Sequence, residues 1–329
     1  MNTDTKEIDI NDFLNTFLNN YYEIRSLLIN NINVFYEMSK FVINQSSLGE
    51  QKEFDWNKIT KSTFLQNVDI INKFFQEIGI QFSMDQIIRD GTLEVIPTNY
   101  ERIMYGLNNY IGDHKEIKVY NNGYITDTIV WVHEISHYRN QPEEGRTEVN
   151  DLFTEALAHT TELIYTDYLE KLGFAYEASY SRNSILNTFK RASSGAYIIS
   201  KIIELYEMMG KVSKETYKEF YGNDEYYDDE TKKFIKNASQ NPFDIFNALW
   251  YTLSGALSIY MYEEYRKNNN YANNLEELNT SLLNGDDINK CLRIIGITGY
   301  NEESLDKIKE AYDEFKKDLD VKTKILLKK

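Results

Sequence analysis

The spacing of hydrophobic residues along this chain predicts a mostly helical protein. Over most of the sequence, apolar side chains recur every three to four residues, which is the period of one face of an α-helix. The pattern predicts a long helix or helix pair over residues 8–45 and another helix over residues 61–78. After these it predicts six further helices, over residues 126–140, 147–172, 180–209, 243–268, 286–294 and 302–318.

A different pattern lies between residues 91 and 124. Alternating or extended apolar stretches, which are typical of short strands, occupy residues 93–96, 102–107 and 117–120. The sequence Asn121-Asn122-Gly123 then supplies a turn. We therefore expect one small antiparallel sheet in a mainly α protein. We also divide the chain into an N-terminal helical region, 1–90, and a second region, 91–329; the alternative is one continuous domain.

Composition agrees with long helices and narrows the choice of partners. The chain has only 3 Pro and 15 Gly, so residues that interrupt helices are scarce. Its 52 acidic and 36 basic residues give a net charge of -16, which repels phosphates and anionic lipid. We therefore expect neither a nucleic acid nor a membrane as partner. A single cysteine, Cys291, and the lack of a signal-peptide pattern or a long apolar run predict a cytoplasmic protein.

One motif carries specific chemistry, His133-Glu134-Ile135-Ser136-His137. On a helix, residues four positions apart lie on the same face, so both imidazoles can bind one metal ion. Glu134 then lies beside the ion, where it can act on a bound water. This His-Glu-x-x-His pattern is typical of zinc peptidases, and it predicts one Zn²⁺ ion as cofactor. The alternative is a helix with two exposed, unrelated histidines.

A catalytic zinc ion needs a third protein ligand and one open position. The next predicted helix carries Glu155 among apolar neighbours, where a lone carboxylate would be costly without a metal or a partner. His159, one turn along the same helix, is the alternative third ligand. Glu162 follows two turns after Glu155 on the same face. It is expected to accept the second N–H of a ligating histidine, unless it forms only a surface salt bridge.

Several segments resemble the M3 metallopeptidases, the family of oligoendopeptidase F and thimet oligopeptidase. Residues 121–137 resemble the approach to that family's zinc helix, and residues 153–162 resemble its third-ligand helix. Residues 221–222, 241–246 and 251–254 resemble segments that lie on the substrate-binding side in that family. The resemblance implies a helical, zincin-type fold whose small sheet lines a deep cleft. It also implies cleavage of short or unstructured peptides.

The same resemblance assigns roles to single residues. It implies His133, His137 and Glu155 as the ligands of the zinc ion, and it favours Glu155 over His159. It also points to Tyr251 as a catalytic tyrosine. The chain departs from the family pattern where Ser136 replaces a glycine and Asn140 a histidine. It departs again where the oxyanion-stabilising histidine and tyrosine are replaced, by Asn241 and Phe243.

The sequence therefore predicts a zinc-dependent peptidase in which Glu134 is the general base acting on zinc-bound water. We expect the peptide to lie extended along residues 117–120 as an added strand. Asn241 and Phe243 favour an alternative, a non-catalytic zinc module that binds a peptide or protein. A protease with a single target is a further alternative.

Overall fold

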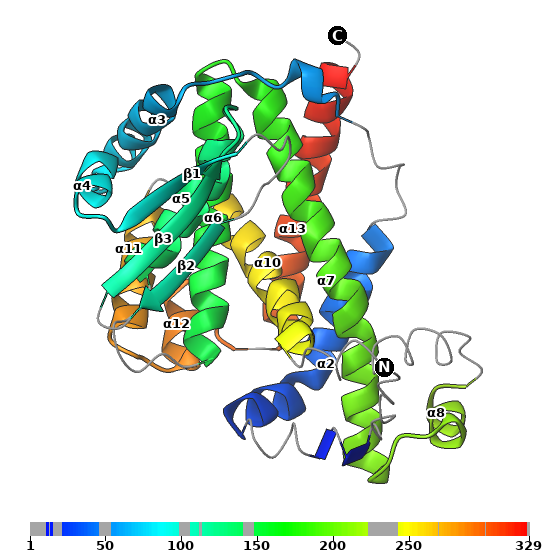
Figure 1. The fold of residues 1–329 in the computed structure, drawn as a ribbon. Helices are drawn as coiled ribbons and strands as arrows, with labels where there is room; N and C mark the ends of the chain where they lie inside the picture. The colour runs from blue at the N-terminus through cyan, green and yellow to red at the C-terminus, as the bar shows by residue number, and fades with distance from the viewer. Residues whose placement is uncertain are drawn as a thin grey trace, which may run out of the picture. The chain divides into compact units, whose positions relative to one another are not determined.

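The computed structural model describes residues 11–12, 14–15, 22–45, 54–98, 106–111, 114–140, 148–222, 243–268, 270–299 and 301–327. It confirms a mainly helical fold (Figure 1). The described helices are α2 (Tyr22–Gln45), η1 (Trp56–Lys58), α3 (Phe64–Glu77), α4 (Met84–Arg89), α5 (Asp127–Asn140), α6 (Glu148–Lys171), α7 (Ala175–Met209), α8 (Lys214–Tyr221), α10 (Phe243–Lys267), α11 (Tyr271–Leu283), α12 (Ile288–Ile294) and α13 (Glu302–Leu327). None of these helices is both long and apolar enough to cross a membrane.

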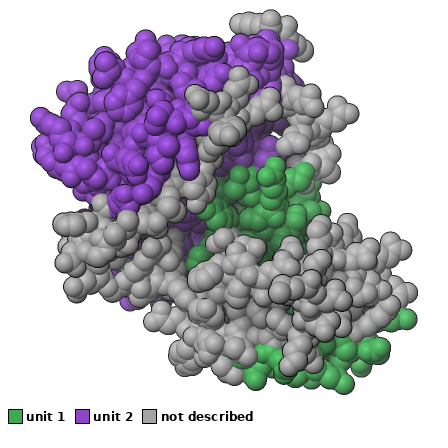
Figure 2. Space-filling view, viewed as in Figure 1, with its two compact units in different colours: residues 1–48, 188–253, 300–305 green, residues 49–187, 254–299, 306–329 purple. Residues whose placement is uncertain are grey.

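The chain divides into two compact units, coloured separately in Figure 2. Unit 1 contains residues 1–48, 188–253 and 300–305, and unit 2 contains residues 49–187, 254–299 and 306–329. Each unit therefore collects segments that lie far apart in the sequence. The two regions expected from the sequence, 1–90 and 91–329, are continuous stretches of chain, whereas the two units are defined by contacts. The division at residue 90 therefore stays a prediction. Helices α5 and α6, which carry the metal motif and the helix after it, belong to unit 2.

The small sheet lies in unit 2 and is mixed rather than antiparallel. Its strands are β1 (Leu93–Pro97), β2 (Gly106–Ile111) and β3 (His114–Asn121), in the order β1-β3-β2. Strands β2 and β3 pair antiparallel, as predicted, with Leu107 opposite Lys118. Strands β1 and β3 pair parallel, with Val95 beside Val119, so the prediction is wrong for this pair. Alternating residues identify strands, but they do not determine in which direction each strand runs relative to β3.

The strand order corrects one further expectation. The described part of the second strand is Gly106–Ile111, and residues 102–105 of the predicted stretch 102–107 lie outside the described part of the chain. Strand β3 has a neighbour on both sides, so a peptide cannot add along residues 117–120. Within the described residues, the open edges of the sheet belong to β1 and β2.

Helix α5 is buried between the sheet and α6. It contacts β2, β3 and α6, and its side chains Ile129, Trp131 and Ile135 are fully buried. The indole N–H of Trp131 donates to the carbonyl of Tyr120, at 2.9 Å, which fixes the helix against β3. A helix packed on several sides holds its polar side chains in fixed positions, as a binding site requires.

The junction between β3 and α5 is clamped by Asp127. One carboxylate oxygen, Oδ2, accepts the backbone N–H groups of Asn122, Gly123 and Tyr124 at 2.8, 2.9 and 3.1 Å. Gly123 has a φ of +83°, which a residue with a side chain rarely adopts. Burial raises the pKa of Asp127 even though these hydrogen bonds lower it. The clamp determines where α5 begins, and therefore where the histidines of its motif lie.

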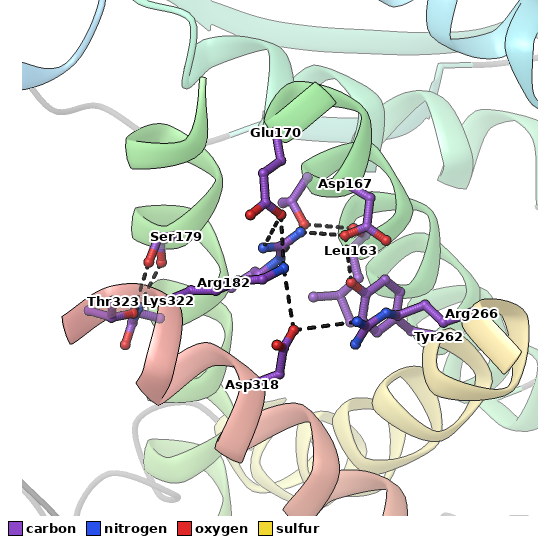
Figure 3. A network of polar contacts seen from close by, with 12 residues as sticks. Leu163, Asp167, Glu170, Ser179, Arg182, Tyr262, Arg266, Asp318, Lys322 and Thr323 are labelled. Carbon is purple, nitrogen blue, oxygen red and sulfur yellow. Dashed lines mark hydrogen bonds and ion pairs between the residues drawn. The ribbon is translucent and has the colours of Figure 1, made fainter. Parts of the chain in front are cut away.

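A second polar network anchors the C-terminal half of α6 (Figure 3). The guanidinium of Arg182, on α7, is buried and donates to Asp167 at 2.5 Å and to Glu170 at 2.9 Å, both on α6. The hydroxyl of Tyr262, on α10, also donates to Asp167, and Lys322, on α13, donates to Glu170. Segments of three other helices in unit 2 thereby hold α6 in place.

Candidate metal centre

Five side chains meet where α5 packs on α6. We call them the His/Glu cluster, and its members are His133, His137, Glu155, His159 and Glu162. The two α5 residues are one helical turn apart, and so are Glu155 and His159 on α6. All five are largely shielded from solvent, with side chains 9–16% exposed.

The ligand atoms of the motif and of Glu155 converge. Nε2 of His133 lies 3.1 Å from Nε2 of His137 and 3.6 Å from Oε1 of Glu155. Nε2 of His137 lies 3.0 Å from Oε2 of Glu155. Ligands of a tetrahedral zinc ion with bonds of about 2.0–2.1 Å lie roughly 3.3 Å apart. The spacing of these three side chains therefore fits a shared metal ion.

The buried carboxylate of Glu155 supports the same conclusion. Its Oε1 atom meets no hydrogen-bond criterion among the described residues, while Nε2 of His159 lies 3.1 Å and Nε2 of His133 3.6 Å away. A buried carboxylate oxygen without a donor is costly, and a cation would remove that cost. A metal ion is the group that this set of nitrogen and oxygen atoms can bind.

Glu162 orients two of the imidazoles. Its Oε2 atom lies 3.3 Å from Nδ1 of His133 and 3.0 Å from Nδ1 of His159. Because a carboxylate only accepts hydrogen bonds, the proton of each ring belongs on Nδ1. Nε2 of each ring is then the nitrogen whose lone pair can bind a metal. Ligand atoms of His133, Glu155 and His159 all lie within 4.8 Å of one another. The sequence presents His159 as an alternative to Glu155, whereas the structure brings both side chains to the cluster.

Opposite charges set the pKa values in the cluster. Burial alone would raise the pKa of Glu155, but the charge and the hydrogen bond of His137 hold it well below its usual range. Burial would also raise the pKa of Glu162, and hydrogen bonds from His133 and His159 lower it instead. Burial would lower the pKa of His159, whereas the two carboxylates raise it to about 10. The carboxylates thus favour positive charge between them, as a proton or a metal cation.

Glu134 lies next to His133 in the sequence and is 8% exposed. Burial raises the pKa of its carboxyl group to about 7, against the opposing charge of His133. The nearby carboxylates of Glu155 and Glu162 raise it further. A carboxyl group with such a pKa can accept and return a proton near neutral pH.

Other residues singled out by the sequence have different positions. The hydroxyl of Ser136 donates to the carbonyl of Val132 at 2.8 Å, so it is satisfied within α5. Tyr251 is half-buried in the part of α10 that belongs to unit 1, and its role stays a prediction. Phe243 begins α10, and Asn241 lies outside the described residues. Sequence reasoning missed the clamp by Asp127, because no local pattern indicates a carboxylate that accepts from backbone N–H groups three to five residues earlier.

A cavity of about 510 Å³ also lies in unit 2, between α3, α6 and α10. Charged side chains, Glu77, Asp167, Lys171 and Arg266 among them, line it together with the aromatic ring of Phe74. No member of the His/Glu cluster lines this cavity. It is therefore separate from the candidate metal centre.

The fold is similar to those of three solved structures. Two solved structures that match are a protein assigned as oligoendopeptidase F from Bacillus anthracis str. Ames and one assigned as a peptidase from Chlamydophila abortus. They match 92% and 91% of this chain, with TM-scores of 0.53 and 0.58 and identities of 14% and 16%. A third is PZ peptidase A bound to an inhibitor, which matches 92% of the chain with a TM-score of 0.53 and 12% identity.

These likenesses are likenesses of fold, and they confirm at that level the resemblance that the sequence motifs indicate. The chain spans only 57%, 56% and 58% of the lengths of the three proteins. No protein-family model matches the sequence. No curated protein matches it either.

Proposed function

We propose that this protein is a zinc-dependent peptidase. The observation that carries the proposal is the convergence of His133, His137 and Glu155, with the buried carboxyl group of Glu134 on the same helix. The fold shared with three oligopeptidases and peptidases supports a peptide substrate. The three ligands are the number that catalytic zinc sites use.

The residues divide the chemistry among them. A zinc ion held by His133, His137 and Glu155 would supply Lewis acidity toward water and toward the scissile carbonyl. Glu134 takes the proton from the attacking water and passes it to the leaving amine. Glu162 keeps the proton of His133 on Nδ1, so that Nε2 remains a ligand.

The substrate class is an extended peptide. Because β3 is central, the peptide would add along an open edge of the sheet, that of β1 or β2, by backbone hydrogen bonds. Such pairing recognises the backbone of the peptide rather than its side chains, and it requires a peptide segment without structure of its own. Short or unfolded peptides are therefore the proposed substrates.

A second candidate is a zinc-containing module that binds a peptide or a protein target without cleaving it. Asn241 and Phe243, which replace the oxyanion-stabilising pair of the resembled family, favour this candidate. Glu134 favours the peptidase, because a module that only binds has no use for a proton acceptor beside the metal.

Incubation of a diverse peptide mixture with the zinc-loaded protein, followed by mass spectrometry, separates the two candidates. We expect cuts that disappear after chelation and in His133→Ala. If the protein binds a full equivalent of zinc but cleaves no peptide in the mixture, a general peptidase is excluded. Cleavage that survives both chelation and His133→Ala would exclude the metal site.

A further inference from the structure

His159 occupies a place in the His/Glu cluster that the proposed three-ligand site does not use. Both of its ring nitrogens face carboxylates, Nε2 at 3.1 Å from Oε1 of Glu155 and Nδ1 at 3.0 Å from Oε2 of Glu162. The side chain is 7% exposed. A histidine that is only packed in a core does not need two buried acidic partners.

The contacts of His159 repeat those of His133. Nδ1 of both rings lies near the same oxygen, Oε2 of Glu162, which has lone pairs for two donors. Nε2 of both rings lies near the same oxygen, Oε1 of Glu155, at 3.6 and 3.1 Å. With the proton on Nδ1, each Nε2 lone pair can bind a cation that lies beside Oε1 of Glu155. The arrangement that prepares His133 as a ligand therefore prepares His159 as well.

We infer that His159 is a fourth protein ligand of the metal ion, beside His133, His137 and Glu155. Glu155 turns Oε2 toward His137, at 3.0 Å, and Oε1 toward His159. Ligand atoms of His133, Glu155 and His159 lie within 4.8 Å of one another. Since His133 has one Nε2 lone pair, the two overlapping sets share one ion rather than holding two.

The inference rests on the proposed zinc site, but it does not depend on catalysis. Four protein ligands are the number found in structural zinc sites, whereas catalytic sites keep one position open. Hydrolysis would then require a fifth ligand position or the withdrawal of His159 from the ion. His159 thus becomes the residue that controls how open the metal site is.

X-ray absorption at the zinc edge tests the inference on the unmutated, zinc-loaded chain, so it does not depend on the folding of a variant. Imidazole rings give a characteristic scattering pattern, from which the number of histidine ligands per zinc ion is determined. We expect three imidazoles per zinc ion. A count of two would overturn the assignment of His159.

Variants give an independent test through zinc affinity and the visible spectrum of bound Co²⁺. Loss of an outer partner of a ligand costs about 10- to 100-fold in metal affinity. His159→Ala removes a ligand, so it is expected to weaken zinc binding more than Glu162→Gln does and to shift the Co²⁺ bands. His137→Ala should still bind one zinc ion, because His133, Glu155 and His159 remain. His133→Ala removes a ligand that belongs to both overlapping sets, so it should weaken zinc binding more than His137→Ala does. His114→Ala, which removes the one histidine outside the cluster, is the matched control.

The outcomes separate this inference from the proposed function. If His159→Ala weakens zinc binding but leaves the Co²⁺ spectrum unchanged, His159 positions Glu155 and is not a ligand. Three imidazoles without peptide cleavage would overturn the peptidase alone. Cleavage with two imidazoles would overturn the fourth ligand alone, and a chain that binds no zinc would overturn both.

Discussion

Nδ1 of His133 lies 3.3 Å from Oε2 of Glu162, which stands on the neighbouring helix α6. The contact joins the metal motif to a residue 29 positions later in the chain. It fixes the orientation of the ring and the position of its proton, and both determine whether Nε2 can bind a metal. The candidate site is thus built from two helices at once.

Glu162→Gln should weaken zinc binding by about 10- to 100-fold, because an uncharged amide holds the two Nδ1–H groups less strongly. Competition with a coloured chelator measures the affinity. Glu276→Gln is the matched control, since Glu276 is 54% exposed and pairs only with Arg139 among the ion pairs of the described residues. Equal zinc affinity in Glu162→Gln and the unmutated chain would contradict the role given to Glu162.

Zinc should stabilise the fold, because the cluster exists only in the folded chain. Ligand at 100 times its dissociation constant adds about 2.7 kcal/mol to the free energy of unfolding. We expect the thermal midpoint to fall on chelation and to recover when zinc is added back. His133→Ala should show a much smaller response. A midpoint indifferent to zinc in the unmutated chain would argue against the metal site.

Asp127→Ala should lower the free energy of unfolding by roughly 2–3 kcal/mol, because three backbone N–H groups lose a buried acceptor. Urea denaturation followed by circular dichroism measures the change. Asp85→Ala, at an exposed carboxylate bonded to Asn72, is the control, with an expected change below about 0.5 kcal/mol. Similar losses in the two variants would show that the clamp contributes little.

Arg182→Met should destabilise the protein by about 3–5 kcal/mol, since it leaves the carboxylates of Asp167 and Glu170 without their buried partner. The free energy of unfolding in urea is the measurement. Lys267→Met provides the comparison, because Lys267 forms its ion pairs at the surface. If both substitutions cost the same, the network in Figure 3 is not the anchor of α6.

The same network predicts a pH dependence. Burial would raise the pKa of Glu170, but the charge of Arg182 and the hydrogen bonds from Arg182 and Lys322 lower it below its ordinary 4.5. The unfolded chain therefore binds a proton at higher pH than the folded chain. The resulting stability is present above about pH 5 and is lost as the pH falls below that value.

Glu170→Gln should flatten this part of the profile. Urea midpoints measured between about pH 3.5 and 7 should fall less steeply in the variant than in the unmutated chain. The other carboxylates titrate in both proteins, so the difference between the two curves isolates Glu170. Parallel curves would mean that its pKa is not lowered by folding.

Local sequence signals predict the elements of the site well. The predicted helix over residues 126–140 corresponds to α5, and the one over residues 147–172 to α6, within one residue at each end. Helical periodicity also predicts which residues of each helix share a face. It cannot predict how α5 and α6 pack, so it presents His159 as a competitor of Glu155. Packing brings both side chains to one cluster.

The sheet and the shorter helices show where local signals fail. The direction of β1 depends on its place beside β3, which no alternating pattern determines. Helix α4 has 6 residues, too few for a periodic pattern. Helix α11 was not predicted either, although Tyr271, Leu275, Leu278 and Leu282 recur at helical spacing. The helical spacing of these four residues is a sufficient signal for α11, which lies between the predicted helices over residues 243–268 and 286–294.

The most direct test of the proposed peptidase is the rate at which zinc-loaded Glu134→Gln cleaves a peptide cut by the unmutated protein. Both proteins should hold one zinc ion, because Glu134 is not a ligand. The account predicts a loss in kcat of at least about 100-fold, since the variant cannot accept the proton of the attacking water. Equal rates at equal zinc content would contradict the role of Glu134 and the mechanism built on it.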